Sequence, residues 1–246
     1  MQPFREFQIY KNVESYLKVY PTFERLIIFE TSRKVRVAGY EPRFKEKKIH
    51  RASHPIFEAE NKLDSLRRSK TRLSDIVLSN DFQFFATFTF AKNRTDLVRL
   101  KKSMSKYLEN TKNRYGDFKY VIVPEFHRDG KSLHFHALFT EFPAPITYSG
   151  HNTKSGEKIY NIKNYTLGFN TLTKIENKEK VSSYVKKYIT KTMVEIPGQK
   201  RYWCSRDLYR PLKIENPGIK LDDYSKLFSK NGLLVYHKDV KINEAL

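Results

Sequence analysis

An Asp-Gly pair between two apolar runs is the feature that most restricts how this chain can fold. The runs cover residues 120–127 and 133–139 and consist mainly of β-branched, aromatic and histidine residues. Asp129 and Gly130 stand between them, and Asp-Gly is a strong signal for a tight β-hairpin turn. If these two are the turn residues, every cross-strand pair of the hairpin is fixed. The sequence therefore predicts an antiparallel strand pair with a defined register.

This register brings one acidic and two histidine side chains together. Glu125 would lie directly opposite His134, and because side chains alternate along a strand, His136 projects from the same face. His127 shares that face nearer the turn, where it would contact a metal ligand or a phosphate. Two imidazoles and a carboxylate without a thiol suit a divalent ion such as Mn²⁺, Mg²⁺, Co²⁺ or Zn²⁺. If the hairpin contains a bulge, Glu125 could rotate away and His127 could replace it.

Further elements are expected around this hairpin. Strands are predicted over residues 82–90 and 166–175, and helices over residues 57–79, 96–112 and 178–193. Residues 142–165, with two prolines and two glycines, are expected to lie outside the core sheet. This order predicts an α+β fold, in which a central antiparallel sheet carries helices packed on one face and a helical or irregular extension precedes it.

The chain divides into three regions. Residues 1–80 form a basic accessory region that ends in an amphipathic helix, and residues 81–210 form the sheet domain with its insert at 142–165. Residues 211–246 form a C-terminal extension.

Charge and aromatic content indicate a nucleic-acid partner. Lys and Arg number 47 against 27 Asp and Glu, which gives a net charge of +20, and 14% of the residues are aromatic. Candidates for holding the phosphate backbone lie on the predicted helix 57–79, although a merely solvated face is an equal alternative: Arg67, Arg68, Lys70 and Arg72. The single cysteine and the absence of a long apolar window predict a protein of the cytoplasm, without a membrane partner.

The predicted helix 178–193 carries a stripe of tyrosine and lysine. Tyr184, Lys187, Tyr188 and Lys191 stand at i, i+3, i+4 and i+7, so they share one side of the helix. Tyrosine is a poor nucleophile at its ordinary pKa near 10, and it needs a metal at the target phosphate or a nearby cation. Lys191 is one turn beyond Tyr188 and could be that cation, while Lys187 is expected to contact the nucleic-acid backbone.

In this order, the motifs resemble those of rolling-circle replication initiators of the HUH endonuclease superfamily. The hairpin motif precedes a Tyr-x-x-x-Tyr-x-x-Lys helix, as in initiators of plasmids and of phages with single-stranded DNA. The resemblance covers residues 82–206 and includes strand 85–90, which is similar to the family's first motif. It implies a ferredoxin- or RRM-like HUH fold, with His134, His136 and Glu125 as metal ligands and Tyr188, ahead of Tyr184, as nucleophile.

The resemblance also implies an activity: metal-dependent nicking and rejoining of single-stranded DNA at a replication origin, through a 5′-phosphotyrosine intermediate. It implies Mn²⁺ or Mg²⁺ as cofactor. The expected partners are an origin strand or hairpin, a separate helicase and host replication proteins in a bacterial cytoplasm. Two alternatives remain open, a non-catalytic protein that binds single-stranded nucleic acid and a single-tyrosine HUH transposase.

Overall fold

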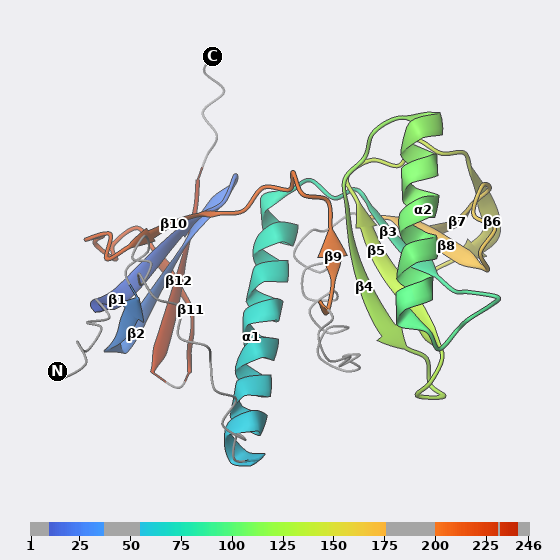
Figure 1. Cartoon of the computed structure of the whole chain (residues 1–246). Helices are drawn as coiled ribbons and strands as arrows, with labels where there is room; N and C mark the ends of the chain where they lie inside the picture. Colours follow the sequence, from blue (N-terminus) through green and yellow to red (C-terminus); the bar gives the residue numbers. More distant parts are fainter. Residues whose placement is uncertain (1–9, 37–54, 176–199, 231, 241–246) are drawn as a thin grey trace. The chain divides into compact units, whose positions relative to one another are not determined.

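The computed structural model describes residues 10–36, 55–175, 200–230 and 232–240 (Figure 1). The chain forms two compact units. The first combines Met1–Ala59 with Arg210–Leu246, and the second is Glu60–Tyr209.

The first unit is an antiparallel sheet built from both ends of the chain. Its strand order is β10-β1-β2-β12-β11, with β1 at Tyr10–Val19, β2 at Phe23–Arg36, β10 at Leu212–Glu215, β11 at Ser225–Lys230 and β12 at Leu233–Asp239. The expected helical or irregular extension is thus wrong for residues 10–36. A register shift between Val13 and Ser15 interrupts the alternation of β1, so the period of two is hidden in the sequence.

The second unit contains the central antiparallel sheet. Its order is β6-β7-β8-β3-β5-β4-β9, with β3 at Phe84–Phe88, β4 at Tyr120–Phe126, β5 at Leu133–Phe139, β6 at Ile146–Asn152, β7 at Lys158–Ile162, β8 at Asn170–Lys174 and β9 at Trp203–Cys204. With the helices described next, this sheet confirms the predicted α+β class.

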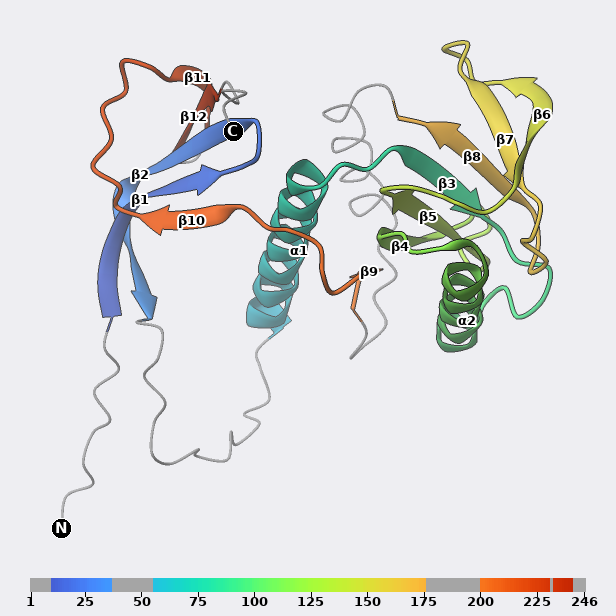
Figure 2. The ribbon, with the colours of Figure 1, turned by 90° about the horizontal axis from the view of Figure 1, so that it is seen from above.

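The two helices of the described residues cover different faces of this sheet (Figure 2). Helix α2 at Leu97–Tyr115 begins at the cap Asp96 and packs on the face that contains Phe88 and Phe135. Helix α1 at Pro55–Ser79 packs Leu73, Ile76 and Val77 on the opposite face, against Val121, Val123 and Leu138. The expectation of helices on one face is corrected here, because the sequence does not tell which face an amphipathic helix covers. Neither helix is long and apolar enough to cross a membrane.

The hairpin of β4 and β5 has the predicted register. Glu125 pairs with His134 and Val123 pairs with His136. The connection itself is longer than two residues, because the Gly130 N–H donates to the His127 carbonyl at 2.9 Å and Gly130 has φ 67°. The positive φ suits glycine, so the turn closes without a change of register.

Residues 142–165 do not lie outside the sheet. They form β6 and β7, which extend it at one edge, and Tyr160 pairs with Leu172 of β8. The glycines that obscured these strands fall at Gly150, where φ is 82°, and at Gly156 in the turn between them, where φ is 91°.

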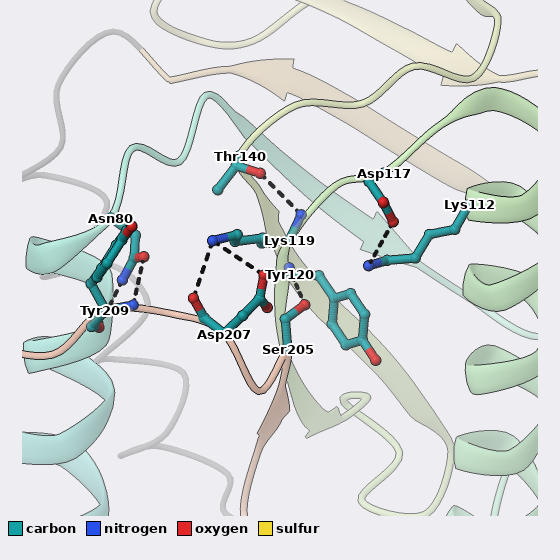
Figure 3. A network of polar contacts seen from close by, with 9 residues as sticks. All are labelled: Asn80, Lys112, Asp117, Lys119, Tyr120, Thr140, Ser205, Asp207 and Tyr209. Carbon is teal, nitrogen blue, oxygen red and sulfur yellow. Dashed lines mark hydrogen bonds and ion pairs between the residues drawn. The ribbon is translucent and has the colours of Figure 1, made fainter.

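The segment around β9 ties the other edge of the sheet to α1 (Figure 3). The Tyr120 N–H donates to Ser205 Oγ at 3.0 Å, and Lys119 Nζ lies 3.2 Å from Asp207 Oδ2. Asn80 Nδ2 donates to the carbonyls of Ile76 and Tyr209 at 2.7 and 2.9 Å, and Asn80 Oδ1 accepts from the Tyr209 N–H at 3.0 Å. One buried amide therefore joins the end of α1 to the segment that follows β9.

Replacing Asn80 by alanine is expected to destabilise the protein by about 2 kcal/mol, because it leaves the Tyr209 N–H without its acceptor and two carbonyls without a donor. Urea denaturation of Asn80→Ala measures this decrease in stability. The matched control is Asn110→Ala on the exposed side of α2, which should change stability by less than about 0.5 kcal/mol. Equal destabilisation in both variants would contradict the role given to Asn80.

Candidate metal centre

Three side chains on β4 and β5 meet at one point. His136 Nε2 lies 2.6 Å from Glu125 Oε2, His134 Nε2 lies 3.0 Å from the same oxygen, and the two Nε2 atoms are 3.0 Å apart. The side chains are 13%, 16% and 7% exposed for Glu125, His134 and His136. The hairpin thus assembles the three predicted ligands into one nearly buried cluster, and these three could hold a metal ion.

The alternation of the two strands places this cluster on the α1 side of the sheet. Val121 and Val123 of β4 and Leu138 of β5 pack in the apolar cluster of α1. Glu125 continues the β4 series by two residues, and His136 continues the β5 series by two. The polar cluster is therefore the continuation of an apolar surface, beyond the part in contact with α1.

His136 is oriented from strand β3. Thr87 Oγ1 lies 3.2 Å from His136 Nδ1, and the Phe85 ring stacks on the imidazole with centroids 5.5 Å apart. A hydrogen bond at Nδ1 leaves Nε2 to face Glu125 and His134, which is how histidine ligands are commonly oriented. Sequence reasoning missed Thr87 and Phe85 as positioning residues, since their contact depends on the pairing of β3 with β5.

Burial favours the neutral form of His134. Its pKa is lowered first by desolvation and then by His136, against the opposing effect of Glu125. Neutral imidazole is the form that ligates metals. His134 Nδ1 is buried and has no hydrogen-bond partner among the described residues, so no contact there competes with the orientation of Nε2.

The donor set and its spacing fit a divalent ion. Nitrogen and oxygen ligands about 2.1 Å from a metal at right angles to one another are separated by roughly 3 Å. The three separations in the cluster are 2.6, 3.0 and 3.0 Å. Three lone-pair donors at such distances repel one another unless a proton or a cation lies among them, so the cluster is suited to a cation with positions left for substrate oxygen.

His127 lies outside this three-residue cluster. It is exposed in the hairpin connection, and its ring centroid is 5.6 Å from that of His134 at 80°. Glu125 keeps its place opposite His134, so the alternative in which His127 replaces it is not realised. The structure places His127 beside one candidate ligand.

The basic residues of α1 are on the solvent side of that helix. Arg67, Arg68 and Arg72 are exposed, and Arg67 forms an ion pair with Asp64 at 3.1 Å. Lys70 is half-buried, and its pKa is lowered by desolvation and by the charge of Arg67. The remaining predicted site residues lie outside the described part of the chain: Tyr184, Lys187, Tyr188 and Lys191.

An antiparallel sheet with a two-histidine, one-glutamate cluster on a central strand pair defines a candidate metal-binding α+β domain. Residues 83–193 match the family model of the replication-associated protein ORF2. This match supports a rolling-circle replication initiator family, and with it a role in the initiation of replication and an endonuclease activity of a general kind. No match was found among curated proteins or among solved structures.

Proposed function

We propose that this protein nicks and rejoins single-stranded DNA at a replication origin. The observation that carries the proposal is the cluster of Glu125, His134 and His136, which lies within the matched residues 83–193. The same range contains Tyr184, Tyr188 and Lys191, so the metal cluster and the proposed nucleophiles occur within one family match.

In the proposed reaction a tyrosine phenolate forms a bond to the scissile phosphorus. The bond from phosphorus to the 3′ oxygen breaks, and that oxygen takes up a proton to become a free 3′-hydroxyl. The product is a 5′-phosphotyrosine, with Tyr188 as the main nucleophile and Tyr184 as a second acceptor. Lys191 stabilises the phenolate. A bound Mn²⁺ or Mg²⁺ would polarise the phosphate and offset its developing charge.

This transesterification conserves the number of phosphodiester bonds. The 3′-hydroxyl, or an end held by the second tyrosine, can therefore reseal the strand without a nucleotide cofactor. The expected substrate is a single-stranded origin or an origin hairpin. Strand separation and synthesis would come from a separate helicase and host replication proteins in a bacterial cytoplasm.

The proposal is tested by a denaturing-gel assay of the full chain with the replicon's own single-stranded DNA. A cleaved product and a covalent protein–DNA species should form with Mn²⁺ or Mg²⁺ and disappear with EDTA. Tight, salt-sensitive binding without either species would favour a non-catalytic single-strand binding protein. Cleavage at the ends of a mobile element instead of an origin would favour the transposase alternative.

The α1 surface is expected to hold part of the DNA backbone. Replacing Arg67, Arg68 and Arg72 together by glutamine should reduce the slope of log affinity against log salt concentration, by about 0.7 for each phosphate that the variant no longer neutralises. Fluorescence anisotropy with a labelled single strand over a salt series measures the slope.

The matched control removes the same number of charges from α2, on the opposite face of the sheet, by replacing Arg99, Lys102 and Lys106 with glutamine. This control should leave most of the slope in place. Equal slopes for the two triple variants would show that α1 contributes only its general charge.

A further inference from the structure

The segment before β8 is held unusually close to the end of β3. A Cβ atom on Gly168 would lie 2.4 Å from the Thr89 carbonyl oxygen and 2.8 Å from its carbon. Both atoms belong to the backbone, so they cannot move away as a flexible side chain would. Only glycine fits at residue 168, and the chain from Leu167 to Phe169 is fixed against β3.

Hydrogen bonds fix the residue that follows. The Phe169 carbonyl accepts from the Thr89 N–H at 2.8 Å, and the Phe169 N–H donates to Thr89 Oγ1 at 3.0 Å. The Tyr165 hydroxyl donates to the Thr89 carbonyl at 2.7 Å, and the Ala91 N–H donates to the Leu167 carbonyl at 2.8 Å. The backbone of Phe169 is therefore rigidly placed.

Despite this scaffold, the side chain of Phe169 is 63% exposed. Its neighbour Asn170 is buried on the α2 side of the sheet, where it bonds Ile162, and Leu172 belongs to the same cluster. Alternation then directs Phe169 to the other side, together with Thr171. That side carries the metal cluster.

Phe169 is also at the correct end of the sheet. Phe88 pairs with Asn170 on one side and with Phe135 on the other, so the next rung aligns Phe169, Thr89 and His134. Two strand spacings amount to about 10 Å. An exposed ring thus lies one intervening strand away from a candidate metal ligand, on the same face.

Cationic side chains surround this end of the sheet. Lys92 and Arg94 follow β3, Arg128 and Lys131 occupy the hairpin connection, and all four are exposed. The Arg94 carbonyl accepts from the Leu133 N–H at 2.7 Å, so this loop is bonded to the start of β5. The positive charge and the isolated ring favour a strand of nucleic acid over an apolar protein partner.

We propose that Phe169 is a stacking platform for an unpaired nucleobase of the DNA strand whose phosphate lies at Glu125, His134 and His136. This inference rests on the proposed function, because the metal cluster defines where the phosphate lies. Any base can stack on an aromatic ring, so the platform orients the strand without reading its sequence. Phe169 is a binding residue for the base and takes no part in bond breaking.

The experiment compares two labelled probes in EDTA, oligo(dT) and an abasic strand of the same length, so that phosphate charge is constant and cleavage is absent. Phe169→Ala should weaken oligo(dT) binding about tenfold and leave the abasic strand unchanged. Phe169→Trp should keep the preference for oligo(dT), whereas Phe169→Leu, which is apolar but has no ring, should lose it.

The matched control is Phe228→Ala in the first unit, where the phenylalanine is also exposed, and it should retain the full preference. Loss of affinity for both probes in Phe169→Ala, or for neither, would overturn the inference. Because cleavage is absent from this measurement, failure of the platform leaves the nicking proposal standing. Conversely, a protein that shows the preference but never nicks would retain the platform and lose the proposed function.

Discussion

His136→Ala is expected to reduce the nicking rate by roughly a thousandfold, as far as removal of the metal with EDTA does. The substitution removes one of three donor atoms that lie within 3.0 Å of one another. The remaining Glu125 and His134 could not hold an ion with the same occupancy. Single-turnover cleavage over a Mn²⁺ titration measures the rate and the apparent affinity together.

Metal binding to this cluster has a second readout that does not depend on activity. Mn²⁺ should raise the melting temperature of the wild-type protein and leave that of His136→Ala unchanged, because a ligand stabilises only the state that binds it. The matched control is His151→Ala on the exposed strand β6, which should behave as wild type in both assays. Cleavage by His136→Ala within about twofold of the wild-type rate would contradict the metal centre.

Tyr188→Phe is expected to abolish the covalent protein–DNA species and to lower cleavage by at least roughly a thousandfold. The change removes only the phenolic oxygen, which in the proposed reaction forms the bond to phosphorus. Binding of the uncleaved strand should stay within about twofold of wild type, since the ring is retained. Quantitative gels of the adduct and anisotropy of the bound strand measure the two effects.

Tyr184→Phe is the matched variant one helical turn away. It should still form the first adduct and should lose rejoining steps that need a second acceptor. Equal and complete loss in both variants would mean that the two phenols act as a unit. Full activity of Tyr188→Phe, with loss in Tyr184→Phe, would exchange their roles.

The candidate metal site could be predicted in large part because it is local. One turn and the period of two place Glu125 opposite His134 and His136 on the same face, and the register was confirmed. The connection differs from the predicted two-residue turn, yet the pairing survives because the hairpin ladder continues to the bond from the His127 N–H to the Ser132 carbonyl.

Features that depend on distant parts of the chain could not be predicted. The strands at 10–36 pair with strands after residue 210, and nothing near residue 20 in the sequence records those partners. The contact of Thr87 with His136 likewise requires the register of β3 against β5. The close approach at Gly168 leaves only a single glycine in the sequence, which is too weak a signal to place Phe169.

Mapping the covalent adduct tests the central claim most directly. The full chain is incubated with the replicon's single-stranded DNA in Mn²⁺ and in EDTA, digested with protease and nuclease, and analysed by mass spectrometry. The account predicts a nucleotide attached through a 5′ phosphate to Tyr188, with a smaller amount on Tyr184, in the Mn²⁺ sample alone. Cleaved DNA with no modified tyrosine, or an adduct that forms equally in EDTA, would contradict it.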